Sequence, residues 1–225
     1  MIMKKERKKL FIVVLVLGLA GISPNLFPAA QAGYAGMSFL ATHLLIPSVV
    51  LIFLLVWLSS YLKYEDVKKQ ILNGILAGVA GTVALEIVRE TGFRLGGMPG
   101  DMPKLLGVLL LNRFAYGPNI WSNLAGWAYH FWNGAAFGII FSLLFGQGKP
   151  WKAILYGIFI GTGFMISPAT TSLGIGILGL EFKDGYQFLI TVILAHIAFG
   201  GVMGWVIYRV NAGLPDVVKR LKLKV

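Results

Sequence analysis

Two apolar segments of this chain carry the same pattern, a histidine followed by two glycines at intervals of four residues. The two copies are His130, Gly134, Gly138 and His196, Gly200, Gly204. Residues four apart share one face of an α-helix, so each histidine would head a groove without side chains. An imidazole can bind a proton, a metal ion or a haem iron. Ionisable groups at membrane depth are costly and mark functional sites.

Further polar residues are expected near the two histidines. Counting along the predicted helices puts both histidines roughly 14–17 Å below one membrane boundary. Glu86 and Arg89 are three residues apart and can pair on one helix face. We therefore expect an outward-opening polar pocket for a ligand or protons, formed by Glu86, Arg89, His130, Asn133, Thr170 and His196.

Structural interpretations compete with this hypothesis at each position. The histidines could form interhelical hydrogen bonds that only lock the bundle, and the glycines could serve helix packing alone. Glu86 and Arg89 could be a structural ion pair near the interface. Sequence alone leaves these alternatives open.

The composition indicates a membrane protein. The 225 residues are 57% hydrophobic and only 13% charged, against about 25% charged residues in soluble domains. The absence of cysteine excludes disulfides, thiolate metal sites and cysteine nucleophiles. We expect one all-α domain over residues 1–225, a polytopic membrane helix bundle. Its six spans are predicted at about 10–31, 37–62, 70–91, 121–146, 152–180 and 185–208.

The charges are distributed unevenly between the two sides of this bundle. The side of the N-terminus holds fifteen Lys and Arg and four Asp and Glu, whereas the remainder holds five of each. The positive-inside rule therefore predicts both termini in the cytoplasm. The basic excess predicts contact with anionic lipid headgroups on that side, and no binding of nucleic acid.

Three segments depart from regular spans. Residues 1–32 resemble a cleavable signal peptide, and cleavage after Ala32 would leave five spans. The 92–120 connection is predicted to hold an ordered loop and a short interfacial helix at about residues 104–113. The fifth span is predicted to be broken, because Pro168 and three later glycines follow its first half.

Four functions fit these features. The first is binding or transport of a small ligand, metal ion or protons, with a discontinuous helix near the site; so small a transporter is expected to form a homo-oligomer. The second is a redox protein with one haem b held by His130 and His196. The third is an enzyme. The sequence contains no hydrolase, zinc-protease or phosphate-loop motif, and acid–base chemistry on a lipid or quinone is the enzymatic alternative that stays open. The fourth is a structural or accessory subunit.

The segment from about residue 70 to residue 208 carries a family resemblance. Its features are His130 followed by Asn133, the run Ile140-Phe141-Ser142, the break at Pro168 and a histidine in the last span. This arrangement resembles the YagU-like group of small bacterial inner-membrane proteins. The resemblance implies a prokaryotic cytoplasmic-membrane protein of poorly defined function, with a connection to acid tolerance.

Overall fold

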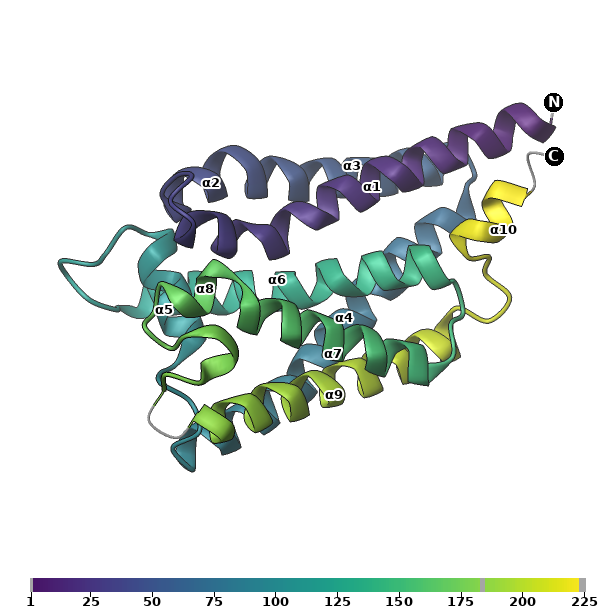
Figure 1. The fold of residues 1–225 in the computed structure, drawn as a ribbon. Coiled ribbons are helices and arrows are strands. Elements are labelled where there is room, and N and C mark those ends of the chain that lie inside the picture. The colour runs from purple at the N-terminus through teal and green to yellow at the C-terminus, as the bar shows by residue number, and fades with distance from the viewer. Residues whose placement is uncertain (1, 183–184, 223–225) are drawn as a thin grey trace.

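The protein is a bundle of long helices that run side by side (Figure 1). The structure, a computed structural model, describes residues 2–182 and 185–222; Lys183, Asp184 and Lys224, included in the charge count, lie outside these ranges. The long helices are α1 (Ile2–Gln31), α3 (Ile46–Tyr61), α4 (Glu65–Arg94), α6 (Ile120–Phe145), α7 (Pro150–Ile166) and α9 (Gly185–Val210). The shorter elements are α2 (Met37–Leu40), η1 (Ala41–Leu45), α5 (Met102–Leu110), α8 (Pro168–Thr171), η2 (Ile177–Gly179) and α10 (Val217–Lys222).

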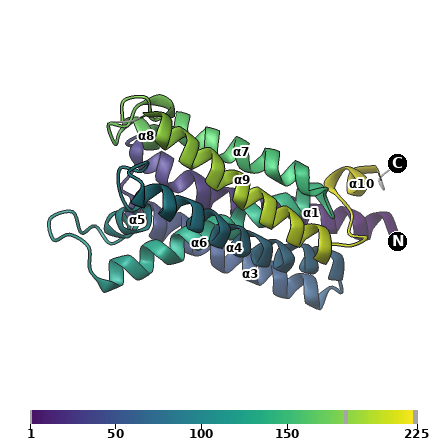
Figure 2. The same ribbon diagram turned by 90° about the horizontal axis from the view of Figure 1, so that it is seen from below.

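The helices have the lengths that membrane crossing requires. Five helices within the described ranges are long and apolar enough to cross a bilayer, and α7 is a shorter apolar helix. The second of the five joins α2, η1 and α3 into one continuous helix, Met37–Tyr61. The chain is thus a multi-pass membrane protein, and the predicted all-α membrane bundle is confirmed. The long helices extend from the end that holds both termini to the opposite end, called the far end below (Figures 1 and 2).

The fifth predicted span is broken, as expected. Helix α7 ends at Ile166, and α8 begins at Pro168, whose ring cannot donate a backbone hydrogen bond. After α8 the chain turns through Gly174, Gly176 and Gly179, which have φ of 67°, 73° and 78°. Side chains other than glycine rarely adopt this left-handed conformation, so these glycines allow the chain to fold back at the far end.

Glycines also set how the helices pack. A Cβ on Gly78 of α4 would overlap the backbone of Gly134 on α6, and Gly74 meets Gly138 in the same way. A second glycine contact joins α7 to α9, where a Cβ on Gly200 would overlap the backbone of Ala153. The predicted close packing of α4 through its small residues is confirmed. The groove expected beside each histidine is filled by the backbone of a partner helix.

The connection between α4 and α6 contains the expected short helix. Helix α5 begins at Met102, two residues before the predicted start, and packs against α6. Gly107 of α5 and Gly126 of α6 each lie against the backbone of the other helix. The 95–101 segment before α5 is non-helical, as predicted.

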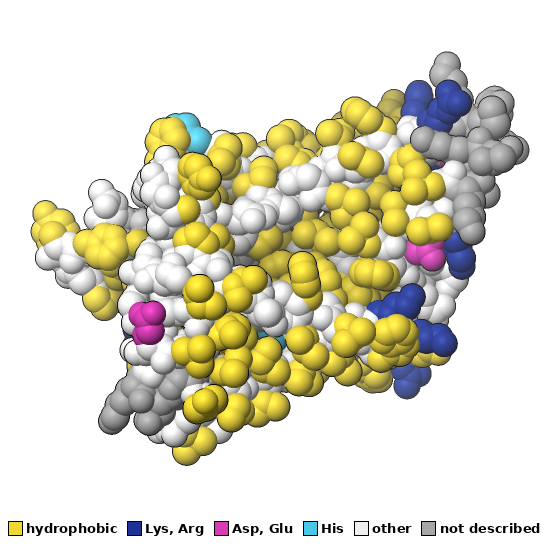
Figure 3. All heavy atoms as spheres, in the orientation of Figure 1, with side chains coloured by type: hydrophobic (Ala, Val, Ile, Leu, Met, Phe, Trp, Pro, Cys, Tyr) yellow, Lys and Arg dark blue, Asp and Glu magenta, His cyan; other side chains and the backbone are white. Residues whose placement is uncertain are grey.

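The surface separates apolar and basic side chains. Apolar side chains cover the flank of the bundle in Figure 3, whereas Lys and Arg gather at the end that holds the termini. Exposed bases at this end include Arg7, Lys63, Lys149, Lys152 and Arg209. The orientation that the charge count gives in the membrane stays a prediction.

Gly78→Ala should destabilise the protein, because the added methyl group forces α4 and α6 apart. We expect a loss of about 1–3 kcal/mol, the usual cost of overpacking a closely packed core. Unfolding of the detergent-solubilised protein, followed by circular dichroism, measures it. The matched control is Gly18→Ala on α1, since a Cβ there meets nothing within 4 Å. Equal stability of the two variants would contradict the assigned role of the glycine contact.

Candidate functional site

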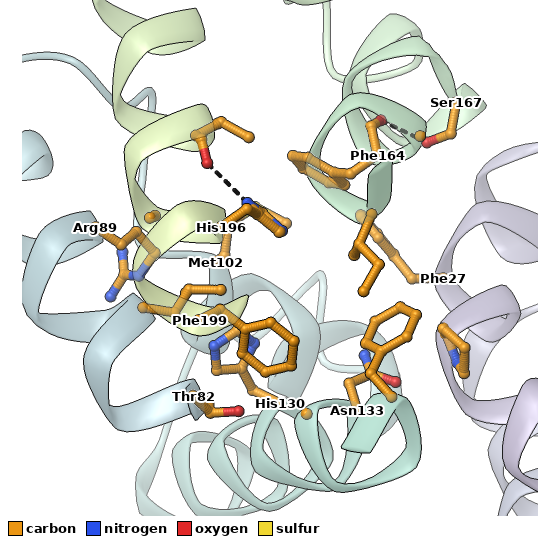
Figure 4. Close-up of a pocket in the computed structure, with 18 of the residues that line it drawn as sticks. Phe27, Thr82, Arg89, Met102, His130, Asn133, Phe164, Ser167, His196 and Phe199 are labelled. Atoms are coloured by element: carbon orange, nitrogen blue, oxygen red, sulfur yellow. Dashed lines mark hydrogen bonds between the residues drawn. The ribbon is translucent and has the colours of Figure 1, made fainter. Parts of the chain in front are cut away.

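A cavity of about 420 Å³ lies between α1, α4, α5, α6, α7 and α9 (Figure 4). It reaches toward the far end, where Met98 and Met102 line it. Most of the lining side chains are apolar, and aromatic rings come from four different helices. These rings belong to Phe27, Phe137, Phe159, Phe164 and Phe199. Such a chamber suits a largely apolar molecule, provided that a few polar groups fix its orientation.

Glu86 joins a buried arginine to one of the two histidines. The Nε and Nη2 atoms of Arg89 donate to the Glu86 carboxylate at 2.8–3.0 Å, a bidentate arrangement. Nε2 of His130 lies 2.8 Å from Glu86 Oε1 and links α6 to α4. The predicted Glu86–Arg89 pair is confirmed. The carboxylate itself stands behind the cavity, whereas Arg89 and His130 line it.

This pair belongs to a larger ionic cluster at the far end. Nη2 of Arg89 is also 3.7 Å from a Glu90 oxygen and 3.9 Å from an Asp101 oxygen. Glu90 pairs with Arg94 at 3.0 Å, and Asp101 pairs with Lys104 at 3.4 Å. Three cationic side chains thus face three carboxylates. The cluster is balanced in charge without any ligand.

The third nitrogen of the Arg89 guanidinium group, Nη1, differs from Nε and Nη2. The residue is only 5% exposed, yet Nη1 has no hydrogen-bond partner among the described residues. A buried donor without an acceptor is costly, typically by about 1–3 kcal/mol. Arg89 is also one of the residues that line the cavity.

His196 presents its ring to the same cavity from α9. Its Nδ1 donates to the carbonyl of Val192 at 2.8 Å, which leaves Nε2 to accept a hydrogen bond (Figure 4). The ring packs over Gly161 of α7, where a Cβ would lie 2.7 Å from the imidazole Cγ. The two histidines thus line one cavity, and each is oriented by a different partner.

The remaining two predicted site residues, Asn133 and Thr170, lie in different surroundings. Asn133 lines the cavity, and its Oδ1 accepts a hydrogen bond from Ser23 Oγ of α1 at 2.6 Å. Thr170 is fully buried and lies outside the lining; its Oγ1 donates to the carbonyls of Met165 and Ser167 at 2.9 and 3.1 Å. Thr170 therefore satisfies the backbone at the break that follows α7. The nearby Ser167 lines the cavity instead.

Sequence reasoning missed the contribution of α1. Pro24, Asn25, Phe27 and Pro28 line the cavity, although the first span was expected only to cross the membrane. The available signal was the pair of prolines four residues apart. A proline inside a helix has no N–H group, so the carbonyl one turn earlier loses its hydrogen-bond donor. The helix face that carries these carbonyls is less suited to close packing against another helix.

The metal and haem alternatives find less support in this geometry. Among the described residues, no group of three or more His, Asp or Glu is placed to hold a metal ion. A haem between His130 and His196 would require His130 to release Glu86 or to use Nδ1. The glycines that would make room for the macrocycle are occupied by helix contacts.

Comparison with known proteins shows the family. Residues 68–215 match the model of DUF6789, a family of unknown function. The chain belongs to this family. The matched segment runs from α4 past α9, so it contains Glu86, Arg89, His130 and His196 but not the α1 side of the cavity. No curated protein and no solved structure matches the chain, and the match does not name the YagU-like group.

Glu86→Gln should destabilise the protein strongly, because it leaves the buried Arg89 without its principal counter-charge. Breaking a buried ion pair costs about 3–5 kcal/mol. The matched control is Glu90→Gln, whose side chain is 43% exposed, and for which a loss of about 1 kcal/mol or less is expected. Chemical unfolding in detergent measures both.

A double variant tests whether the loss comes from the unpaired charge. Glu86→Gln combined with Arg89→Gln should be more stable than Glu86→Gln alone. Equal losses for Glu86→Gln and Glu90→Gln would contradict the assigned role of the pair.

Proposed function

We propose that this integral membrane protein binds a small, mostly apolar molecule that carries a neutral hydrogen-bond acceptor such as a carbonyl oxygen. The observation that carries the proposal is that Arg89 lines a chamber together with several phenylalanines, while its Nη1 has no hydrogen-bond partner among the described residues. Nε2 of His196 can accept a hydrogen bond in the same cavity, so it would contact a donor group of a ligand and not the carbonyl. Glu86 holds Arg89 and His130 in place without touching the ligand.

The charge balance favours a neutral ligand. Arg89 already donates hydrogen bonds to both oxygens of Glu86 and lies within 4 Å of two further carboxylates. An anionic ligand would add a fourth negative charge to a cluster that is already neutral. A carbonyl would satisfy Nη1 without this repulsion, because a neutral acceptor needs no counter-ion.

The packing below the cavity favours binding over passage through the membrane. Toward the terminal end, the buried side chains of Gln70, Ser142 and Asn211 form a hydrogen-bonded cluster. The glycine contacts of α4 with α6 lie on the same side and bring the backbones together. A ligand in the cavity would therefore meet closely packed helices on that side, which supports a binding protein more than a transporter, proton path or redox carrier.

The charge distribution supports an orientation for this site. We infer that both termini lie in the cytoplasm, because the bases gather at the terminal end. The cavity then lies in the outer half of the membrane. The exposed bases at the terminal end would contact anionic headgroups of the inner leaflet.

Acetophenone and ethylbenzene test the proposal, because acetophenone has a carbonyl group where ethylbenzene has a methylene group. Acetophenone should raise the thermal unfolding midpoint of the detergent-solubilised protein, since a ligand that binds the folded state stabilises it. Ethylbenzene should raise it less. A hydrogen bond from a charged donor is worth about 1.5–3 kcal/mol, so the two affinities should differ by about tenfold or more.

Arg89→Lys should abolish the difference between the two compounds, because lysine keeps the charge for Glu86 but lacks Nη1. Arg94→Lys is the matched control, since Arg94 is 77% exposed and pairs with Glu90 outside the cavity. It should retain the difference. Equal responses of the unsubstituted protein to both compounds, or a difference that survives Arg89→Lys, would overturn the proposal.

A further inference from the structure

We propose that the ligand is a single-chain membrane amphiphile that enters the cavity sideways from the bilayer, between α1 and α7. This inference rests on the proposed function and adds the source of the ligand and its route. The carbonyl-bearing head would lie at Arg89, and the chain would pass through the opening between the two helices.

The exposure of the lining residues locates the opening. Of the residues that line the cavity, Asn25 and Phe159 are exposed, and the others are half-buried or buried. Asn25 lies on α1 and Phe159 on α7, and the Phe159 side chain is 74% exposed. A residue that both lines a cavity and reaches the surface marks where the two meet. The cavity thus meets the surface along these two helices.

The helix packing leaves this side open. Along the described residues, α1 packs mainly against α6 and α3, and α7 packs mainly against α9. No comparable contact joins α1 to α7. Gly163 lies on α7 beside the cavity, and a Cβ there would meet nothing within 4 Å. Figure 4 labels Phe164 of α7 and Phe27 of α1 beside the same space.

The opening lies at the depth of the hydrocarbon. Phe159 is nine residues from the start of α7 at Pro150, or about 14 Å along the helix. This distance is close to half of a hydrocarbon core of about 30 Å. The surface at this level faces lipid chains, so the molecules that meet the opening are those dissolved in the bilayer.

The far end of the cavity is covered. Helix α8 packs on α1, and Ser172 Oγ donates to Gln31 Oε1 at 2.8 Å, which ties the broken segment to the end of α1. Helix α5 covers the first turns of α6 on the other side. Our sequence prediction had the pocket open toward the outside; these contacts at the far end favour the lateral route instead.

The volume favours one chain. About 420 Å³ lies toward the lower end of the range for drug-sized ligands. Such a space suits a head group with the first part of one chain better than a whole two-chain lipid. The rest of the chain would stay in the bilayer beside Phe159 and Asn25.

A photoreactive probe tests the route. The probe is the methyl ester of a straight-chain fatty acid with a diazirine near the ester, added to phosphatidylcholine vesicles that hold the full chain. Illumination followed by peptide mass spectrometry should find cross-links to cavity residues such as Phe164 and Phe199. Labelling confined to lipid-facing residues would overturn the lateral route.

Gly163→Leu should abolish the cavity cross-links, because the added side chain would occupy the opening, where a Cβ meets no atom within 4 Å. Gly18→Leu is the matched control: Gly18 is an exposed helical glycine of α1 with equally open surroundings, and it does not line the cavity. It should leave the cross-links unchanged. Cavity labelling that persists in Gly163→Leu overturns the route.

Phe159→Ala provides a second reading that does not depend on how Gly163→Leu folds. Removing an exposed ring at the edge of the opening should speed cavity labelling, and an unchanged rate counts against the route.

Acetophenone binding separates the two proposals. If acetophenone stabilises the protein but the probe never labels the cavity, the lateral route fails and the proposed function stands. If neither binds, both fail.

Discussion

The buried charge of Arg89 is the constraint on which the site depends. A guanidinium that is 5% exposed inside an apolar bundle requires a counter-charge, and Glu86 provides it one helical turn away. The same carboxylate engages His130, so a single ion pair also connects α4 with α6 and sets the direction of the imidazole. Its geometry uses Nε and Nη2 of the arginine and leaves Nη1 without a hydrogen-bond partner among the described residues.

The cavity exists because the glycine contacts draw helices together elsewhere. Contacts of α4 with α6 and of α7 with α9 are close enough for backbones to touch. Helix α7 packs against α9 and α1 packs against α6, and along the described residues α1 and α7 share no contact of comparable extent. Large aromatic side chains line this space but do not fill it. The repeated histidine–glycine pattern therefore has two parts, in which the glycines pack helices and the histidines face the cavity.

Local rules predicted much of this arrangement. Hydropathy located the spans, Pro168 and the following glycines located the break, and the spacing of three located the Glu86–Arg89 pair. Long-range packing was beyond such rules. Spacing could not show that partner backbones fill the glycine grooves, that α1 lines the cavity, or that Thr170 bonds to the broken backbone. Each of these depends on which helices become neighbours, and a helical period does not contain that information.

A crystal structure with a bromine-tagged ligand tests the central claim most directly. The ligand is a straight-chain fatty acid methyl ester with bromine at the end of its chain, and anomalous scattering locates the bromine. The account predicts the ester carbonyl within hydrogen-bond distance of Arg89 Nη1, and the chain leading to bromine at the opening between Asn25 and Phe159. Bromine found only on other lipid-facing surfaces would contradict it, with an ordered water joining Arg89 Nη1 to Asp101 Oδ1, which likewise lacks a hydrogen-bond partner among the described residues.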